Sequence, residues 1–269
     1  MGHNSSYIAH TPDENGVIPY LGKEHAVWSD LMASQLPLLT GRACQEYIYG
    51  LQQLSMSSDK IPQCVELSKP LRDCTGWRVE PVPALISFDK FFAMLADRCF
   101  PAASFIRSRE EFEYLKEPDI FHELFGHTPL LTNSDVADFT ARIGRLGTKL
   151  PSHYHAGLAR LYWMTVEFGL IKTGNGIRAY GAGIVSSKSE LQYAIESDYP
   201  ARTPFNLLEV ARTKYRIDQL QPKYFVINSF GDFTRLSDGE IVDAIDEAKS
   251  VGMIPIVDTP EDIWPPKAA

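Results

Sequence analysis

The apolar residues of the chain recur mainly at the spacing of an α-helix. In residues 23–55, Trp28, Leu31 and Met32 stand at positions i, i+3 and i+4, which puts them on one helical face. The same pattern predicts a second helix from about Arg42 to Leu54. Further helices are predicted around 65–71, over 134–146, after the turn at Pro151 and through Glu167, and after Leu207.

Serine residues mark the starts of four more helices. Ser87 precedes a stripe of apolar residues, and a serine followed three positions later by glutamate is the sequence signature of a capping box. Glu190 belongs to one such pair, so it is interpreted as a cap rather than a catalytic group. The stripe comprises Phe88, Phe91, Phe92, Leu95 and Cys99, and the three boxes are Ser108-x-x-Glu111, Ser187-x-x-Glu190 and Ser237-x-x-Glu240.

Only a few segments read as extended. Trp77 to Pro83 is predicted to be a brief extended connection, and Tyr224 to Ile227 an apolar strand. Ile177 to Val185 is predicted to form a hairpin or an irregular extended pair. The fold class is therefore mainly α (α+β). Residues 1–19, which are polar and contain two prolines, are expected to be a flexible N-terminal arm, and residues 20–269 a single domain.

Composition excludes several kinds of partner. The formal charge of −8 argues against nucleic acid or an anionic membrane, because both require a basic patch. The four cysteines form no Cys-x-x-Cys pair, which favours reduced thiols and a cytoplasmic protein. Neither a secretory signal nor a run of transmembrane length is present in the sequence.

The chemistry centres on Pro118 to Pro129, where two histidines flank an apolar segment. His122 and His127 stand five positions apart, about 140° around a regular helix, so their imidazoles would not converge on one ion. We therefore expect His122 inside a helix and His127 on a terminating turn made by Gly126, with Pro129 preventing the helix from continuing. A core histidine held by hydrogen bonds is the alternative for each.

Glu167 is the candidate for a third ligand. It is the only charged residue between Leu161 and Ile171, and a carboxylate in such surroundings is costly unless it is paired or bound to a cation. A salt bridge to a buried arginine, or a position that faces water, would also explain it. Two histidines and one carboxylate make the facial triad of non-haem iron(II) oxygenases, which leaves one side of an octahedron open.

Three motifs in this order resemble the pterin-dependent aromatic amino acid hydroxylases. They are Glu-Pro-Asp-Ile-Phe-His-Glu-Leu-Phe-Gly-His at 117–127, Tyr-Trp-Met-Thr-Val-Glu-Phe-Gly-Leu at 162–170 and Ala-Tyr-Gly-Ala-Gly-Ile-Val-Ser-Ser at 179–187. The resemblance covers roughly residues 20–230 and is greatest to the short bacterial phenylalanine 4-monooxygenases. It implies the family's catalytic-domain fold, in which helices and a few short strands surround a non-haem iron site.

The resemblance also implies a role for ten residues. His122, His127 and Glu167 would bind Fe(II). Substrate-binding residues would be Arg107, which holds the carboxylate, Asp119, which steadies that arginine, Pro118 and Trp163, which hold the ring, and Ser186 beside the ligands. Cofactor-binding residues would be Phe91, on which the pterin stacks, and Glu123, which contacts it through water. From the residues alone, Phe91 would be core, and Arg107 and Glu123 would be surface groups.

The implied reaction converts L-phenylalanine and O2 to L-tyrosine with a tetrahydropterin as co-substrate. Leu115 departs from the animal enzymes, which carry a threonine there that helps to bind the amino acid. Residues 255–269 contain four prolines and no heptad, so a monomer or small homo-oligomer is expected in place of the animal-type tetramer. The alternatives are a zinc hydrolase with Glu123 as base, a tryptophan or tyrosine hydroxylase of the same family, and an inactive binding protein.

Overall fold

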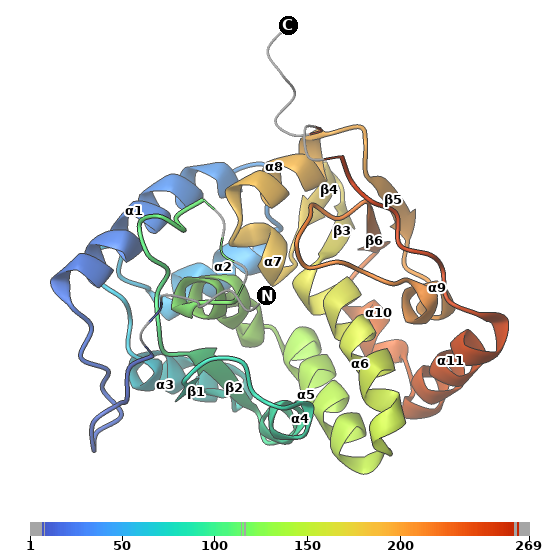
Figure 1. The fold of residues 1–269 in the computed structure, drawn as a ribbon, viewed down its shortest axis with the longest axis horizontal. Helices are drawn as coiled ribbons and strands as arrows, with labels where there is room; N and C mark the ends of the chain where they lie inside the picture. The colour runs from blue at the N-terminus through green and yellow to red at the C-terminus, as the bar shows by residue number, and fades with distance from the viewer. Residues whose placement is uncertain (1–6, 8, 114, 116, 261–262, 264–269) are drawn as a thin grey trace, which may run out of the picture.

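Helices account for about half of the described residues. The structure, a computed structural model, describes residue 7, residues 9–113, residue 115, residues 117–260 and residue 263. Its α-helices are α1 (Gly22–Leu39), α2 (Gln45–Leu54), α3 (Cys64–Thr75), α4 (Phe88–Ala96), α5 (Ser134–Lys149), α6 (His155–Tyr162), α7 (Ala182–Val185), α8 (Lys188–Glu196), α9 (Leu207–Arg212), α10 (Gly231–Arg235) and α11 (Asp238–Val251) (Figure 1). The predicted class, mainly α with a few short strands, is confirmed.

The described strands form two small sheets on opposite sides of the molecule (Figure 1). The parallel pair consists of β1 (Arg78–Val82) and β2 (Cys99–Ala103). The larger sheet has the order β4 (Gly176–Ala179), β3 (Gly169–Thr173), β6 (Lys223–Ile227), β5 (Ala201–Pro204), with only the β3–β4 pair antiparallel. Pro204 can end β5 because this is an edge strand, where a missing N–H costs no ladder hydrogen bond.

Local sequence signals account for several of these elements. Trp28, Leu31 and Met32 are all buried on α1, as their spacing predicts. Ser87 caps α4 by accepting from the N–H of Lys90, and Ser237 forms a full capping box at the start of α11. These caps satisfy backbone donors that a helix leaves without an internal partner.

Outside Pro118–Pro129, three segments differ from their predicted secondary structure. Ser108 and Glu111 hydrogen-bond to each other, but the chain there forms a turn instead of a helix. Cys99 does not continue the stripe on α4, because that helix ends at Ala96 and Cys99 begins β2. Of the segment from Ile177 to Val185, only the first part is extended and pairs with β3, while the second part forms α7.

Part of the predicted N-terminal arm contacts the domain. Residues 1–6 and 8 lie outside the described residues. Tyr7 stacks on Phe105 with 3.8 Å between ring centroids and donates to Glu117 Oε2 at 2.6 Å, and Ile18 is buried. The division into an arm and a single domain stays a prediction. No helix among the described residues combines the length and the apolar character needed to cross a membrane.

Candidate active site

Two π-helices carry the candidate metal ligands. The first, η1 (His122–His127), begins and ends with a histidine, and the second, η4 (Trp163–Glu167), ends with the glutamate. In a π-helix each backbone hydrogen bond spans five residues instead of four, so residues five apart come to lie on the same side. The wider turn therefore brings His122 and His127 together, which a regular α-helix would not do.

The predicted terminating turn at Gly126 is wrong. Gly126 is absent from the residues with positive φ, and the chain continues from His127 into a 3₁₀-helix, η2 (Thr128–Thr132). Pro129 is tolerated there because it occupies the first turn, where no internal N–H bond is required. Gly126 is needed instead for close packing, since a Cβ would lie 3.0 Å from the carbonyl oxygen of Ala182 in α7.

The donor atoms of His122, His127 and Glu167 converge on one point. The two Nε2 atoms lie 3.1 Å apart, and Glu167 places Oε1 at 3.0 Å from His127 Nε2 and Oε2 at 3.6 Å from His122 Nε2. Adjacent ligands of an octahedral ion at about 2.1 Å are about 3.0 Å apart, so these spacings fit a single first-row metal ion. Two imidazole lone pairs and a carboxylate facing each other would repel without a cation between them.

A second carboxylate, that of Glu123, lies close to the same point. Its oxygen and the two imidazole nitrogens all lie within 4.8 Å of one another. Glu167 is nearer to both histidines, so it fits the ligand position better. Burial, with Glu167 and Asp119 nearby, raises the pKa of Glu123 well above its usual range, whereas the imidazoles of His127 and His122 outweigh burial and lower the pKa of Glu167.

Each histidine has a partner for its second ring nitrogen. His122 Nδ1 lies 3.0 Å from Ser186 Oγ, whose own hydrogen is donated to the carbonyl of Ala182. Ser186 must then accept from Nδ1–H, which leaves Nε2 with the lone pair that a metal requires. Burial lowers the pKa of His122 to about 4, so this imidazole is neutral at pH 7.

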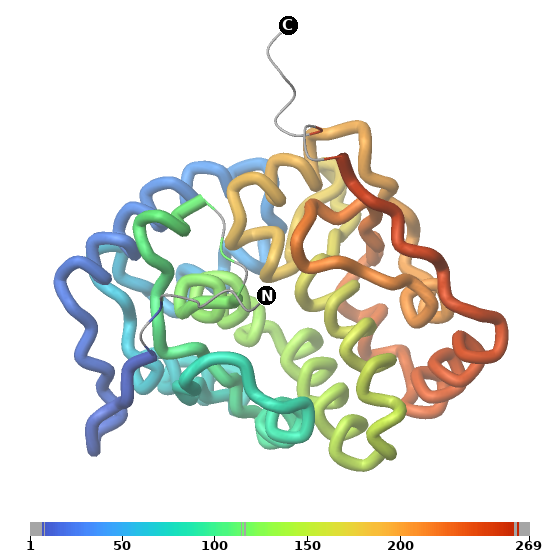
Figure 2. The backbone as a smooth tube through the Cα atoms, viewed as in Figure 1, coloured from blue at the N-terminus to red at the C-terminus, as the bar shows by residue number. Residues whose placement is uncertain are grey.

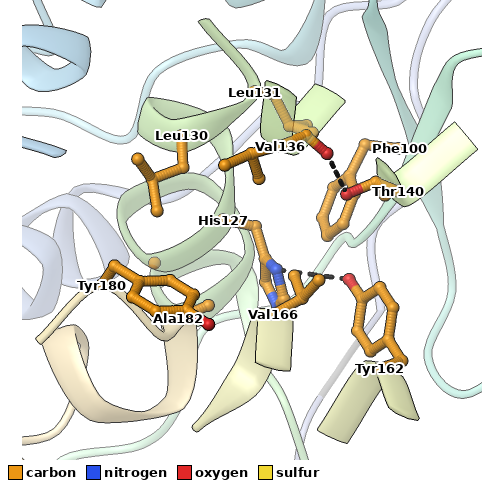
Figure 3. A pocket seen from close by; sticks show the side chains of 11 residues that line it. Phe100, His127, Leu130, Leu131, Val136, Thr140, Tyr162, Val166, Tyr180 and Ala182 are labelled. Atoms are coloured by element: carbon orange, nitrogen blue, oxygen red, sulfur yellow. Dashed lines mark hydrogen bonds between the residues drawn. The ribbon is translucent and has the colours of Figure 1, made fainter. Parts of the chain in front are cut away.

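Figure 3 shows the side chains that surround the imidazole of His127. Tyr162 points its hydroxyl at Nδ1 of His127, 3.4 Å away, and Phe100 lies against the imidazole with 4.7 Å between ring centroids. The space between them and Val166 is a small apolar cavity of about 10 Å³. The apolar packing restrains the ring of His127, and the Tyr162 oxygen can accept from Nδ1–H.

Arg107 and Asp119 form a buried ion pair beside the ligands. Arg107 donates through Nε and Nη2 to the two oxygens of Asp119, at 2.8 and 3.0 Å, and Asp119 is fully buried. Asp119 also accepts from the backbone N–H of His122, so the pair is attached to the start of η1. The Arg107 guanidinium outweighs burial and lowers the pKa of Asp119. With one bond to the carbonyl of Phe112, Arg107 uses three of its five N–H groups within the described chain.

One cavity of about 920 Å³ connects nearly all the residues that the resemblance singles out. Asp119 is the exception, since it lies behind Arg107. The residues from the predicted set that line the cavity are Phe91, Arg107, Pro118, His122, Glu123, His127, Trp163, Glu167 and Ser186.

Sequence reasoning did not identify Tyr215 and Gln221, which also line this cavity and contact Trp163. They lie 52 and 58 residues beyond Trp163, in a segment with no recognisable motif. Only their tertiary contacts single them out.

Comparisons with known proteins agree with this geometry. A family model described as biopterin-dependent aromatic amino acid hydroxylase matches residues 7–240. The phenylalanine-4-hydroxylase of Pseudomonas aeruginosa is 48% identical over 98% of this chain and 98% of its own, and that of Vibrio cholerae is 45% identical over 96% and 89%.

Solved structures lead to the same group. The phenylalanine hydroxylase of Legionella pneumophila superposes with a TM-score of 0.89 at 49% identity, covering 92% of this chain and 98% of its own. The apo form of the cold-active enzyme of Colwellia psychrerythraea gives 0.90 at 44% identity, covering 92% and 96%.

Proposed function

Because this chain belongs to the biopterin-dependent aromatic amino acid hydroxylases, we propose that it converts L-phenylalanine and O2 to L-tyrosine with a tetrahydropterin as co-substrate. The observation that carries the proposal is the convergence of two imidazoles and one carboxylate at the wall of a cavity large enough for an amino acid and a pterin together. Iron and tetrahydropterin are the cofactors of the family. When bound, they supply the electrons that activate O2, one of whose atoms enters the ring.

His122, His127 and Glu167 would hold the ferrous ion. Two imidazoles and one carboxylate are the ligand set of non-haem iron(II) oxygenases, and they would leave coordination positions of a bound ferrous ion available to O2. Ser186 keeps His122 in the required tautomer by accepting from Nδ1–H, and Tyr162 serves His127 in the same way. These residues would hold and orient the metal, while the apolar side chains around them would exclude water.

Arg107 would bind the carboxylate of the substrate. Its pairing with Asp119 locks the plane of the guanidinium and leaves two N–H groups for a carboxylate, which is the geometry that a planar fork of donors recognises. Pro118 and Trp163 line the same cavity and would hold the ring.

Phe91 and Glu123 would contact the pterin. Phe91 lines the cavity and meets the ring of Tyr162 edge-on, with 5.4 Å between centroids, so one face of Phe91 can stack on a flat heterocycle. Glu123 is buried at the same wall next to the first ligand. Phe91 lies on α4 and Glu123 on η1, and both line the cavity.

The experiment is reconstitution with Fe(II) without oxygen, followed by O2, a tetrahydropterin and each aromatic amino acid in turn. We expect L-tyrosine from L-phenylalanine, with oxidation of about one pterin per product. Zinc-loaded protein that cleaved peptides, with no iron-dependent product, would instead support a hydrolase with Glu123 as base. The comparisons do not favour that alternative or a tryptophan or tyrosine hydroxylase.

We also propose a cytoplasmic enzyme that is a monomer or small homo-oligomer. Cys44, Cys64 and Cys99 are free and buried, which suits a reducing compartment. Light scattering tests the assembly, and a tetramer would contradict it.

A further inference from the structure

Gln221 is a buried glutamine whose side-chain amide has only one chemically consistent orientation. It is 2% exposed, and its Nε2 lies 2.9 Å from the carbonyl oxygen of Arg216 and 3.1 Å from that of Gln219. Carbonyl oxygens only accept, so the NH2 group must face them. Oε1 is thereby turned toward the indole N–H of Trp163, 3.4 Å away.

Glu190 fixes the backbone of Gln221 from another part of the fold. The side chain of Glu190 does not close the predicted capping box; only Ser187 caps α8, by accepting from the N–H of Glu190. The Glu190 carboxyl instead accepts from the backbone N–H of Gln221 at 3.2 Å and from the hydroxyl of Tyr224 in β6. The chain leading into β6 is therefore tied to α8 at Gln221.

Trp163 is the side chain that this arrangement serves. Its indole stacks on Tyr215 with 4.3 Å between ring centroids and a 10° angle between the ring planes. On Phe168 the distance between ring centroids is 4.6 Å. Tyr215 lies in the segment whose carbonyls bind Gln221. This segment runs beside the C-terminal stretch, to which Gln219 and Leu220 are hydrogen-bonded (Figure 2). The Tyr215 ring and the Gln221 amide oxygen thus both meet the indole of Trp163 at the cavity wall.

We propose that Gln221 is a positioning residue for the aromatic ring of the substrate, acting through the hydrogen bond that sets the plane of Trp163, with Glu190 and Tyr224 holding Gln221 in place. The ligand class is the flat side chain of an aromatic amino acid. The inference rests on the proposed function, because it assigns a ring-binding role to Trp163. It adds that discrimination between one-ring and two-ring substrates depends on a residue that contacts no metal ligand.

The first test observes the indole directly, with ¹⁵N-labelled tryptophan in the metal-free full-length protein. Trp163→Phe identifies the Nε1–H signal of Trp163. In Gln221→Leu this signal should move upfield and exchange faster with solvent, because the N–H has lost its acceptor. An unchanged signal would overturn the proposal, and this measurement does not depend on any enzymatic activity.

The second test is kinetic, on iron-loaded protein. Gln221→Leu should raise KM for L-phenylalanine roughly 5- to 10-fold, the effect of one lost hydrogen bond, and should change the ratio of kcat/KM for phenylalanine to that for tryptophan, with iron content unchanged. In a Trp163→Phe background the same substitution should add little, because the partner is already gone. An equally large effect in both backgrounds would refute the role of Gln221.

The matched control is Gln219→Leu, the same substitution two residues away. The Gln219 side chain hydrogen-bonds to the backbone of Val257 and Thr259, whereas the indole N–H of Trp163 donates to Gln221, so this change removes two bonds of the segment and keeps the indole bond. It should leave the Trp163 signal and the substrate ratio unchanged; an equal shift would reduce Gln221 to a structural role.

If Gln221→Leu does not fold, Tyr224→Phe is the second variant. It should move the Nε1–H signal of Trp163 in the same direction but by less, because Tyr224 acts on Gln221 only through Glu190. Wild-type protein that makes no tyrosine would refute the proposed function. The Trp163 signal would still test the hydrogen bond between Gln221 and Trp163, because that measurement does not depend on activity.

Discussion

At the scale of single residues, the choice between two neighbouring carboxylates decides the composition of the metal site. Glu123 precedes Glu167 in the sequence and adjoins His122, yet Glu167 approaches both imidazoles more closely. Sequence reasoning selected Glu167 because it stands alone in an apolar stretch, where a charge needs a partner. The same reasoning could not find Gln221 or Tyr215, since a buried glutamine and a tyrosine in a segment without a motif have nothing that distinguishes them.

Replacing Glu167 by glutamine should abolish iron binding without unfolding the protein. The amide keeps the size of the side chain but removes the charge, and loss of a direct ligand should exceed the roughly 10- to 100-fold effect of losing a residue that only orients one. The affinity for iron, measured by equilibrium dialysis, should fall at least about 100-fold. The circular dichroism spectrum should stay the same as that of the wild type. Glu123→Gln is the control and should keep its iron; the reverse result would exchange the two carboxylates.

Replacing Arg107 by lysine should weaken binding of phenylalanine and leave iron in place. Lysine keeps a cation beside buried Asp119 but loses the planar fork, so a bidentate contact with the substrate carboxylate is lost. The expected loss is about 1.5–3 kcal/mol, or roughly 10- to 100-fold in affinity. Calorimetric titration with L-phenylalanine measures it, and equal affinity in both proteins would remove Arg107 from this role. Arg109→Lys, at an exposed ion pair, is the matched control.

At the scale of elements, the π-helices explain both the success and the failure of the local prediction. A spacing of five between His122 and His127 is incompatible with a shared face on an α-helix, and the sequence therefore indicated an irregularity. It did not indicate which one, because a glycine turn and a wider helical register fit the same twelve residues. Packing decides, since η1 packs against α7 and β2, and the carbonyl of Phe125 accepts from the Tyr47 hydroxyl of α2.

Tyr47→Phe should therefore destabilise the first ligand helix. The Tyr47 hydroxyl donates to the carbonyl of Phe125 at 2.6 Å, and both residues are buried, so the variant leaves a carbonyl without its donor. The expected loss in the free energy of unfolding is about 1–3 kcal/mol in chemical denaturation. Tyr49→Phe on the same helix is the control, because Tyr49 is 58% exposed. Equal stability of the two variants would contradict the account of η1.

At the scale of the whole molecule, segments far apart in the sequence build one cavity. The three family motifs contain most of the ten predicted site residues. In the structure, nine of those ten residues line this cavity. The strands β2, β3 and β5 were not predicted, because each is only four or five residues long and its pairing is set by partners elsewhere in the chain. Long-range pairing of this kind leaves little periodicity to read.

Glu190 connects this tertiary organisation to pH. Burial raises the pKa of Glu190 from 4.5 to about 7, although bonds from Tyr224 and Gln221 act in the opposite direction. Burial also raises the pKa of Tyr224 and Tyr193, the titratable groups beside it, so both stay protonated in this range. Between pH 4.5 and 7 the folded chain thus binds more protons at Glu190 than the unfolded chain, and stability falls as pH rises through this window and is level above it.

The comparison that isolates this effect is wild type against Glu190→Gln, at equal iron loading, with the free energy of unfolding measured from pH 4.5 to 8. Other titrating groups contribute to both proteins and cancel in the difference. Relative to the variant, wild type should lose on the order of 3 kcal/mol between pH 4.5 and 7, since a tenfold change in proton affinity corresponds to about 1.4 kcal/mol. Parallel stability curves for the two proteins would mean that the Glu190 carboxyl has the same pKa in the folded and unfolded states. The carboxyl that links α8 to β6 would then not be protonated by burial.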